Sequence, residues 1–336
     1  MAALTRGRPW LDALAVVVAA LILFAFTMPH TVTFEDAGLF DSVCYTGGIA
    51  HPPGYPLFTL MCTPLFQLPL EPAIIGNSMS ALFGALTCGL LVLVLDRLGV
   101  IRLVSITGGL LLAVSDTFWS QSIIVEVYTL NTLLVLGVLY FSLCFREAPS
   151  RCLAWTTTLV FSLSIANHWP LTVLALPGLL AVCLSRLDWI LEQRRNPVFW
   201  AGLVGSALLG ISPYFTLLLK HHLIVSFSGP VDGPKALWDY FMRRAYTHVD
   251  SQAAANITDK WHYILWFIRR MPHEISLVLL PFAALGVLAG HKRLGWPVQV
   301  GIGLIFLGGS LGLILLLGYE YEYPHEISLR PFLLVG

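Results

Sequence analysis

The stretch 11–28, LDALAVVVAALILFAFTM, decides the fold class of this chain. Its 18 residues include one charged side chain, Asp12, and an apolar run of this length is typical of a membrane-spanning helix. Further apolar runs lie near 73–95, 103–118, 127–145, 152–167, 170–185, 198–218, 273–290 and 297–318, and another begins at Pro331. We therefore expect an all-α polytopic membrane protein with about nine to ten transmembrane helices, built as one domain over 1–336.

The composition supports this class. Of the 336 residues, 57% are hydrophobic and only 11% are charged, whereas soluble domains carry about 25% charged residues. The formal net charge is zero, so no basic surface indicates a nucleic-acid partner. Ten Trp and eleven Tyr residues match the aromatic enrichment of membrane interfaces. This composition predicts that the chain is surrounded by membrane lipid.

The two ends of the chain and the cysteines add further expectations. Arg6 and Arg8 precede the first run as in a signal peptide, but no small-x-small cleavage site follows, so we favour an uncleaved first span. The chain stops inside an apolar segment, and we expect a C-terminal part beyond it. The six cysteines show no metal-binding spacing. Cys44 and Cys62 fall outside the spans, where a disulfide between them is one option.

The loop charges predict an orientation. With a cytoplasmic N-terminus and alternating spans, the inner side receives 11 of the 19 basic residues and 5 of the 19 acidic ones, as the positive-inside rule requires. The loops 29–72 and 219–272 then lie outside, together with the turns at 116–128 and 167–170. The segment 55–70 is apolar but short and proline-rich, and we interpret it as re-entrant or surface-lying. A bacterial inner membrane or an ER-type membrane fits this arrangement.

The first outer loop, FEDAGLFDSVCYTGGIAHPPGYPLF (34–58), holds the candidate chemistry. Adjacent Glu35 and Asp36 repel each other, so one should have a raised pKa, as suits a general base or a metal ligand. The alternative is a solvated loop start. The prolines of HPPGYP make a rigid loop that would hold His51 beside the carboxylates, or merely a stiff helix entry.

Other outer segments supply further candidates, each with a structural alternative. Glu126, followed by Tyr128, could be a helix N-terminal charge, and Asn167 with His168 could bind terminal carbonyls. In LWDYFMRRAY (237–246), Arg243, Arg244 and Tyr246 suggest phosphate capture, or an amphipathic helix lying on the membrane.

These motifs resemble a known family. EDAGLF, YTGGIAHPPGYPLF, FWSQSIIVEVYTLN, ANHWPLTVLALPG and LWDYFMRRAY follow the order of domain-of-unknown-function family 2723, the transmembrane-protein-260-like O-mannosyltransferases, over roughly residues 10–250. The resemblance implies a GT-C-like glycosyltransferase with outer-face catalytic loops, which uses a polyprenyl-phosphate-linked sugar and a protein or glycoconjugate acceptor. Asp36 matches the aspartate of the family's Asp-Ser-Gly-Glu-like motif, whose glutamate falls on Leu39.

The resemblance also implies roles for the candidate residues. Asp36 would act as general base, with Glu35 as a possible substitute for the missing glutamate. The substrate-binding candidates are His51, Tyr55, Glu126, Tyr128, Asn167, His168, Arg243, Arg244 and Tyr246. No cofactor is predicted; the paired carboxylates and His51 permit a divalent metal without requiring one. A transporter is the alternative, although its charges would lie nearer the membrane midplane.

Overall fold

The computed structural model describes residues 8–220, 225–247, 255–322, 325–326 and 329–335 as an all-α membrane protein. The long apolar helices are α1 (Pro9–Thr27), α4 (Pro72–Arg97), α7 (Tyr128–Glu147), α8 (Arg151–Cys183), α10 (Pro197–Ile211) and α16 (Trp296–Leu307). Proline occupies the first turn of α1, α4, α10 and α16, where its missing N–H costs nothing. The expected fold class is confirmed.

Shorter helices join and cover these spans. They are α2 (Ala37–Thr46), α3 (Pro56–Leu65), α5 (Arg102–Val114), α6 (Asp116–Ser122), α9 (Leu187–Glu192), α11 (Phe215–Leu219), α12 (Pro234–Phe241), α14 (Ile257–Ile275), α15 (Leu280–Leu294) and α17 (Leu313–Leu316). Single turns include η2 (Gln193–Arg195), η4 (Arg244–Tyr246) and η6 (Arg330–Val335), and a π-helical stretch, η5 (Gly308–Gly312), joins α16 to α17.

The helix α8 is a hairpin. His168 has non-helical angles, φ −148° and ψ 85°, where the chain reverses. The hydroxyls of Ser164 and Thr172 lie 2.7 Å apart across the turn, and Arg186, just beyond the second arm, donates to the carbonyl of Arg146 at the end of α7. The two arms therefore take the places of the separately expected spans at 152–167 and 170–185.

The sequence predicts about nine to ten spans, but fewer helices of the described structure are long and apolar enough to cross a membrane. Among the described residues six helices qualify, or seven if the α5–α6 pair, bent by 67°, counts as one span. This count takes the hairpin arms together as Arg151–Arg195. The predicted span at 273–290 is wrong in its bounds: the chain there is divided between α14 and α15. The segment from Pro331 forms η6 and packs against η5, α6 and α7.

Small residues let the spans pack closely. A Cβ added at Gly178 in α8 would collide with the carbonyl oxygen of Gly301 in α16, and one at Gly109 in α5 would lie 2.8 Å from the carbonyl oxygen of Cys88 in α4. Such close backbone approach is a usual source of helix association in membranes, where burial of apolar surface no longer drives it.

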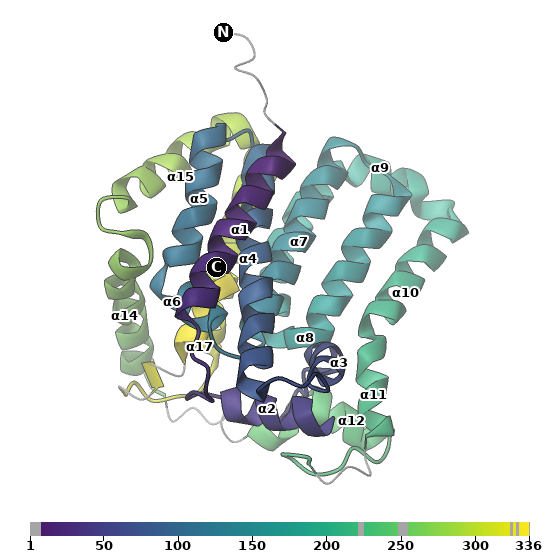
Figure 1. Cartoon of the computed structure of the whole chain (residues 1–336). Helices are drawn as coiled ribbons and strands as arrows, with labels where there is room; N and C mark the ends of the chain where they lie inside the picture. The colour runs from purple at the N-terminus through teal and green to yellow at the C-terminus, as the bar shows by residue number, and fades with distance from the viewer. Residues whose placement is uncertain (1–7, 221–224, 248–254, 323–324, 327–328, 336) are drawn as a thin grey trace.

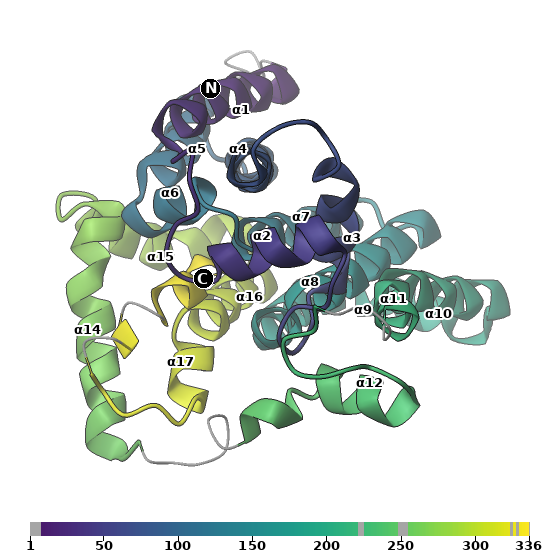
Figure 2. The ribbon, with the colours of Figure 1, turned by 60° about the horizontal axis from the view of Figure 1, so that its bottom comes forward.

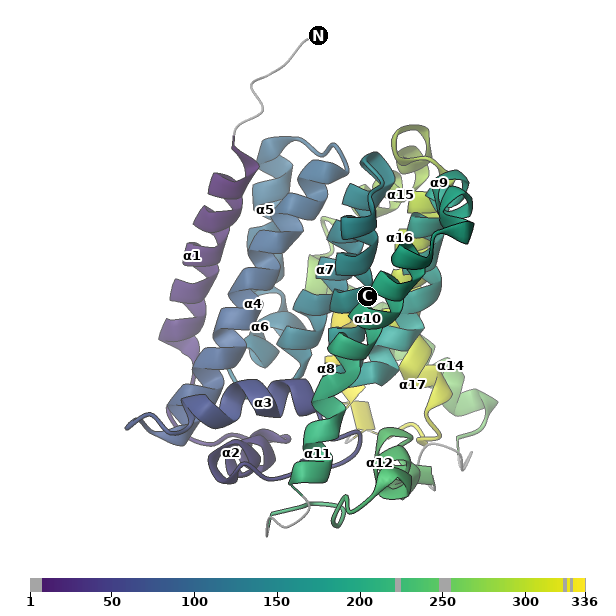
Figure 3. The same cartoon turned by 90° about the vertical axis from the view of Figure 1, so that its right-hand side faces the viewer.

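The connections separate into two ends. Helices α2, α3, α11 and α12 lie at one end of the bundle, which we call the loop end; α9 and the start of α1 lie at the opposite end (Figure 1, Figure 3). Viewed onto the loop end, α2 crosses the ends of the central helices (Figure 2). The disulfide Cys44–Cys62 ties α2 to α3. Of the described segments predicted to share one face, α2 and α3 of the first loop and α12 of the long loop are thus at the loop end, whereas α14 runs along the side of the bundle.

Candidate active site at the loop end

Asp36 and His51 form the centre of the site. Asp36 is the N-cap of α2, and its Oδ2 lies 3.0 Å from Nε2 of His51. Nδ1 of His51 lies 3.1 Å from the carbonyl oxygen of Pro52. Because a carbonyl oxygen only accepts, Nδ1 is the donor in that contact. The Asp36 side chain remains 47% exposed, so its second oxygen is open to a substrate.

Glu35 points away from His51. Its backbone has φ 64°, the left-handed region that residues other than Gly and Asn rarely adopt, and its Oε2 accepts a hydrogen bond of 2.9 Å from the amide of Gln121 in α6. Burial raises the pKa of Glu35, opposed by Gln121 and the charge of Arg330 and assisted by that of Asp36. The expectation of a raised pKa in the adjacent pair is confirmed for Glu35.

Glu126 binds the backbone at the start of α2. This fully buried side chain accepts from the backbone N–H of Asp36 (3.2 Å) and from that of Val127 (3.4 Å). Its own N–H donates to the Ser80 hydroxyl in α4. Burial, then the charges of Asp36 and Glu35, raise the pKa of Glu126. The alternative of a helix-terminal carboxylate is thus partly correct, because Glu126 accepts from the residue that precedes α7.

An aromatic stack lies beside the carboxylates; we use this name for His51, Tyr55, Tyr128 and His168. The rings of Tyr55 and His168 are stacked with centroids 5.8 Å apart, and His51 meets Tyr55 edge-on at 5.1 Å. Tyr128 contacts His168 at 5.7 Å. Asn167 donates to the carbonyl of Val127 at 3.0 Å. The buried Nδ1 of His168, for which a carbonyl contact was the structural alternative, has no hydrogen-bond partner among the described residues. The stack joins α3, α7 and the α8 turn.

The two adjacent arginines face different surroundings. Arg244 pairs with Asp239 of α12 at 2.9 Å and is 58% exposed. Arg243 lies over the ring of Tyr246, 5.0 Å from its centroid, and Tyr246 meets His51 edge-on at 6.0 Å. Burial raises the pKa of Tyr55, and the charge of Arg243 counteracts it. The structure therefore brings Arg243 and Tyr246 to the aromatic stack, whereas Arg244 faces α12.

A second ionic cluster borders the site, and the sequence did not predict it. Asp116 at the start of α6 pairs with Arg270 of α14 and with Arg330 of η6. Glu274 bonds Arg270 at 3.1 Å and the N–H of Thr117 at 3.0 Å. Phe332, two residues after Arg330, packs on Tyr128 with centroids 5.8 Å apart.

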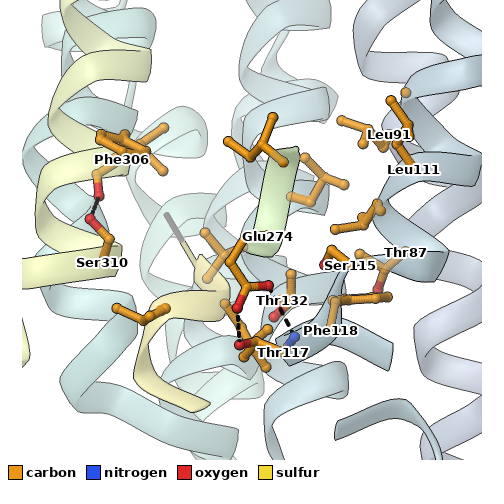
Figure 4. Close-up of a pocket in the computed structure, with 18 of the residues that line it drawn as sticks. Thr87, Leu91, Leu111, Ser115, Thr117, Phe118, Thr132, Glu274, Phe306 and Ser310 are labelled. Atoms are coloured by element: carbon orange, nitrogen blue, oxygen red, sulfur yellow. Dashed lines mark hydrogen bonds between the residues drawn. The ribbon is translucent and has the colours of Figure 1, made fainter. Parts of the chain in front are cut away.

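An apolar cavity of about 370 Å³ lies beside this cluster. Its wall comes from α4, α5, α7, α14, α16 and η6, and Glu274 and Thr117 form its polar side (Figure 4). Leu333 and Leu334 of η6 also line it. One short segment, η6, thus contacts both the aromatic stack and the cavity.

No group of three or more His, Cys, Asp or Glu side chains that could hold a metal ion occurs in the described part of the chain. Asp36 and His51 approach each other closely, but Glu35 turns toward Gln121.

Residues 36–192 match the sequence model of the protein O-mannosyl-transferase TMEM260 N-terminal domain. These residues are therefore similar to that N-terminal domain. The predicted family resemblance is confirmed.

Two curated relatives extend the match. Mouse protein O-mannosyl-transferase TMEM260 is 30% identical over 219 residues, which cover 60% of this chain and 30% of the relative. A Dictyostelium discoideum protein of the same name is 25% identical over 251 residues, covering 68% of this chain and 30% of the relative. The chain thus matches about a third of the length of these relatives. No solved structure matches.

The matched residues contain most of the candidate site. Asp36, His51, Tyr55, Glu126, Tyr128, Asn167 and His168 fall within the matched residues. Glu35, Arg243, Arg244 and Tyr246 lie outside them, as do Arg270 and Arg330. The structure places the TMEM260-type carboxylate and aromatic groups together, and later segments bring the arginines to them.

Proposed function

We propose that this protein is a membrane glycosyltransferase of the GT-C-like type, with Asp36 as general base. The acceptor is a hydroxyl group of a protein or glycoconjugate, and the sugar, mannose by analogy with the names of the relatives, comes from a polyprenyl-phosphate donor. The observation that carries the proposal is the half-exposed Asp36 carboxylate, which contacts His51 while Glu126 accepts from the backbone N–H of Asp36. Asp36, His51 and Glu126 all lie in the residues that match the TMEM260 N-terminal domain.

The proposed reaction is a single displacement. The acceptor oxygen attacks the anomeric carbon, its proton passes to Asp36, and the bond from that carbon to the phosphate oxygen breaks with its electron pair on the phosphate. The configuration inverts. His51 has both ring nitrogens engaged, so it orients Asp36 and is not itself the base. Arg243 would stabilise the charge that develops on the phosphate.

The surroundings of the site suit a lipid-linked donor. A polyprenyl phosphate has an anionic head and a long apolar tail, so its site must place polar groups beside an apolar space. The cavity lined by Leu333 and Leu334 lies at such a boundary, next to the cluster of Asp116, Arg270 and Arg330. We propose that the tail enters this cavity.

The loop end would face the outside or the lumen. The positive-inside bias supports this orientation. The Cys44–Cys62 disulfide at the loop end supports it independently, because disulfides persist in oxidising compartments.

The test is sugar transfer by the purified full chain in detergent. Polyprenyl-phosphate mannose is offered with hydroxyl-bearing peptide acceptors, and product is measured by mass spectrometry. Asp36→Asn keeps the side-chain size but removes the proton acceptor, so turnover should fall by about 10²–10⁴-fold. Glu35→Gln should reduce it less, because Glu35 bonds Gln121 and not the reacting groups.

Asp232→Asn provides the control, since this exposed acid lies in the second loop of the same end. It should leave turnover unchanged, and all variants should match in thermal stability. Near-normal turnover of Asp36→Asn would show that Asp36 is not the base. If Asp36→Asn were active and Glu35→Gln inactive, the base would be Glu35. A transporter needs a sealed membrane to act, so transfer in detergent also distinguishes the two functions.

A further inference from the structure

A second cavity lies away from the loop end, between the arms of α8. Its volume is about 290 Å³, and α7, both arms of α8, α9 and α10 form its wall. The wall is almost wholly apolar, as Val138, Phe161, Leu179 and Phe199 illustrate. It is separate from the cavity beside the candidate active site, with which it shares no lining residue.

This cavity reaches the lipid-facing surface. Two of its lining residues, Leu180 on α8 and Trp200 on α10, are each 45% exposed. Water does not fill a cavity that offers it so few hydrogen-bond partners. In a membrane the molecules next to such an opening are lipids, and an acyl chain matches the apolar wall.

A cationic turn adjoins the cavity. Arg194 and Arg195 lie in η2, between Ile190 of α9 and Phe199 of α10, which both line the cavity. Both arginines are exposed, and no acidic group of the described chain pairs with either guanidinium. The indole of Trp200 donates to the carbonyl of Arg194 at 3.2 Å, which holds the turn against the cavity wall.

A third arginine starts the first arm of α8 near this turn. Arg151 is exposed and precedes Trp155 by one helical turn. The indole of Trp155 donates to the carbonyl of Phe199 at 3.0 Å. The start of the first arm is therefore adjacent to the start of α10, and Arg151 adds to the positive charge of that region.

We propose that the cavity binds one acyl chain of an anionic phospholipid, whose phosphate contacts Arg194 and Arg195. The chain would enter past Leu180 and Trp200, and the headgroup would remain at the interface, where arginine provides donor forks for phosphate oxygens. The site is independent of glycosyl transfer, so it stands or falls separately from the proposed function.

The experiment measures lipids retained by the purified full chain. The protein is incubated with mixed micelles of phosphatidylglycerol and phosphatidylcholine in equal amounts, and bound lipids are counted by native mass spectrometry. Wild type should retain phosphatidylglycerol selectively. A positive side chain near an anionic headgroup changes binding by about fivefold, so Arg194→Gln/Arg195→Gln should reduce the selectivity by about an order of magnitude.

Filling the cavity tests the acyl chain. Ala154→Phe places a ring in the cavity without changing charge and should lower retention of both lipids; Ala154→Leu replaces it if the larger side chain impairs folding. Two controls match these changes: Ala201→Phe on the exposed side of α10, and Arg8→Gln, which removes an exposed arginine ahead of α1. Neither should alter retention.

Three outcomes would overturn the proposal. The first is a lack of selectivity in wild type. The second is selective binding that survives both the arginine and the cavity variants. The third is full competition by glycerophosphoglycerol, a headgroup without chains, which would show a surface anion site only.

Discussion

At the scale of single residues, the least expected side chain is Asp41. It lies in α2 and is only 6% exposed, and neither carboxylate oxygen has a hydrogen-bond partner in the structure. The absence of a side chain at Gly76 of α4 makes room for the Asp41 carboxylate, because a Cβ at Gly76 would lie only 2.8 Å from Oδ1 of Asp41. An ionised carboxylate in such surroundings is unfavourable.

Asp41 should make the stability of the protein depend on pH. Burial raises its pKa from 3.8 to about 6. Between these values the folded state binds more protons than the unfolded state, so stability falls as pH rises from about 4 to 6 and stays lower above that range. Asp41→Asn cannot ionise, and its unfolding temperature should exceed that of wild type at pH 7.5 but not at pH 4.

Thermal unfolding followed by intrinsic fluorescence in one detergent measures this difference. Asp232→Asn, an exposed acid, should follow the wild-type curve at both pH values. An equal offset between Asp41→Asn and wild type at pH 4 and pH 7.5 would mean that Asp41 does not titrate in this range.

The arginine pair gives a second residue-scale prediction. Arg243→Ala should lower kcat/KM for the lipid-linked donor by about 10–100-fold, the effect of losing one charge-assisted contact of roughly 1.5–3 kcal/mol. Arg244→Ala is its matched control, because Arg244 pairs with Asp239 and faces α12. Loss of activity in Arg244→Ala alone would show that the phosphate contacts the other arginine.

At the scale of elements, the α2–α3 pair forms the frame of the site. Asp36 caps α2, and His51 and Tyr55 lie in the connection to α3. Tyr55 itself has φ 44°, in the left-handed region. The buried rings of Phe40 and Phe58 pack edge-on between these helices, with centroids 5.4 Å apart. Asp36 and His51 therefore stay together only while α2 and α3 keep their packing.

The disulfide should stabilise this frame. Cys44 and Cys62 are separated by 18 residues, and closing a loop of this size contributes roughly 3 kcal/mol in the chain-entropy description. Cys44→Ser/Cys62→Ser should lower the unfolding temperature and the activity together. Mass spectrometry after alkylation under non-reducing conditions checks the bond directly. Alkylation of both thiols in untreated protein would contradict it.

At the scale of the whole molecule, the two ends differ in kind. The loop end carries the carboxylates, the aromatic stack and the disulfide, whereas the opposite end carries α9 and the turn η2 with Arg194 and Arg195. The α8 hairpin links the two, because its turn provides Asn167 and His168 at the loop end and its arms enclose the second cavity.

The orientation can be tested with a native cysteine. Cys152 is a free, exposed thiol at the start of α8, at the end opposite the site. In intact cells it should not react with an impermeant maleimide, and it should react after lysis. Asp232→Cys at the loop end should react without lysis. Labelling of Cys152 in intact cells would reverse the orientation.

The sequence by itself determined the fold class and most of the site. Apolar runs long enough to span a membrane must form helices there, because a helix satisfies its backbone hydrogen bonds within its own segment. The motifs around Asp36, His51, Glu126 and His168 also predicted one shared end of the bundle, and the structure places them there.

Tertiary structure decided what depends on contacts between distant segments. A local sequence pattern cannot show that Arg270 and Arg330 contact the start of α6, because both are distant from it in the chain. Arg270 is 154 residues from its partner Asp116, and Arg330 is 213 residues from its partner Thr117. Nor can it distinguish Arg243 from Arg244, since only the left-handed backbone of Arg243 and the position of Asp239 send the two side chains in different directions. Asp41 shows the same limit, because its pKa depends on the wall that α4 places against it.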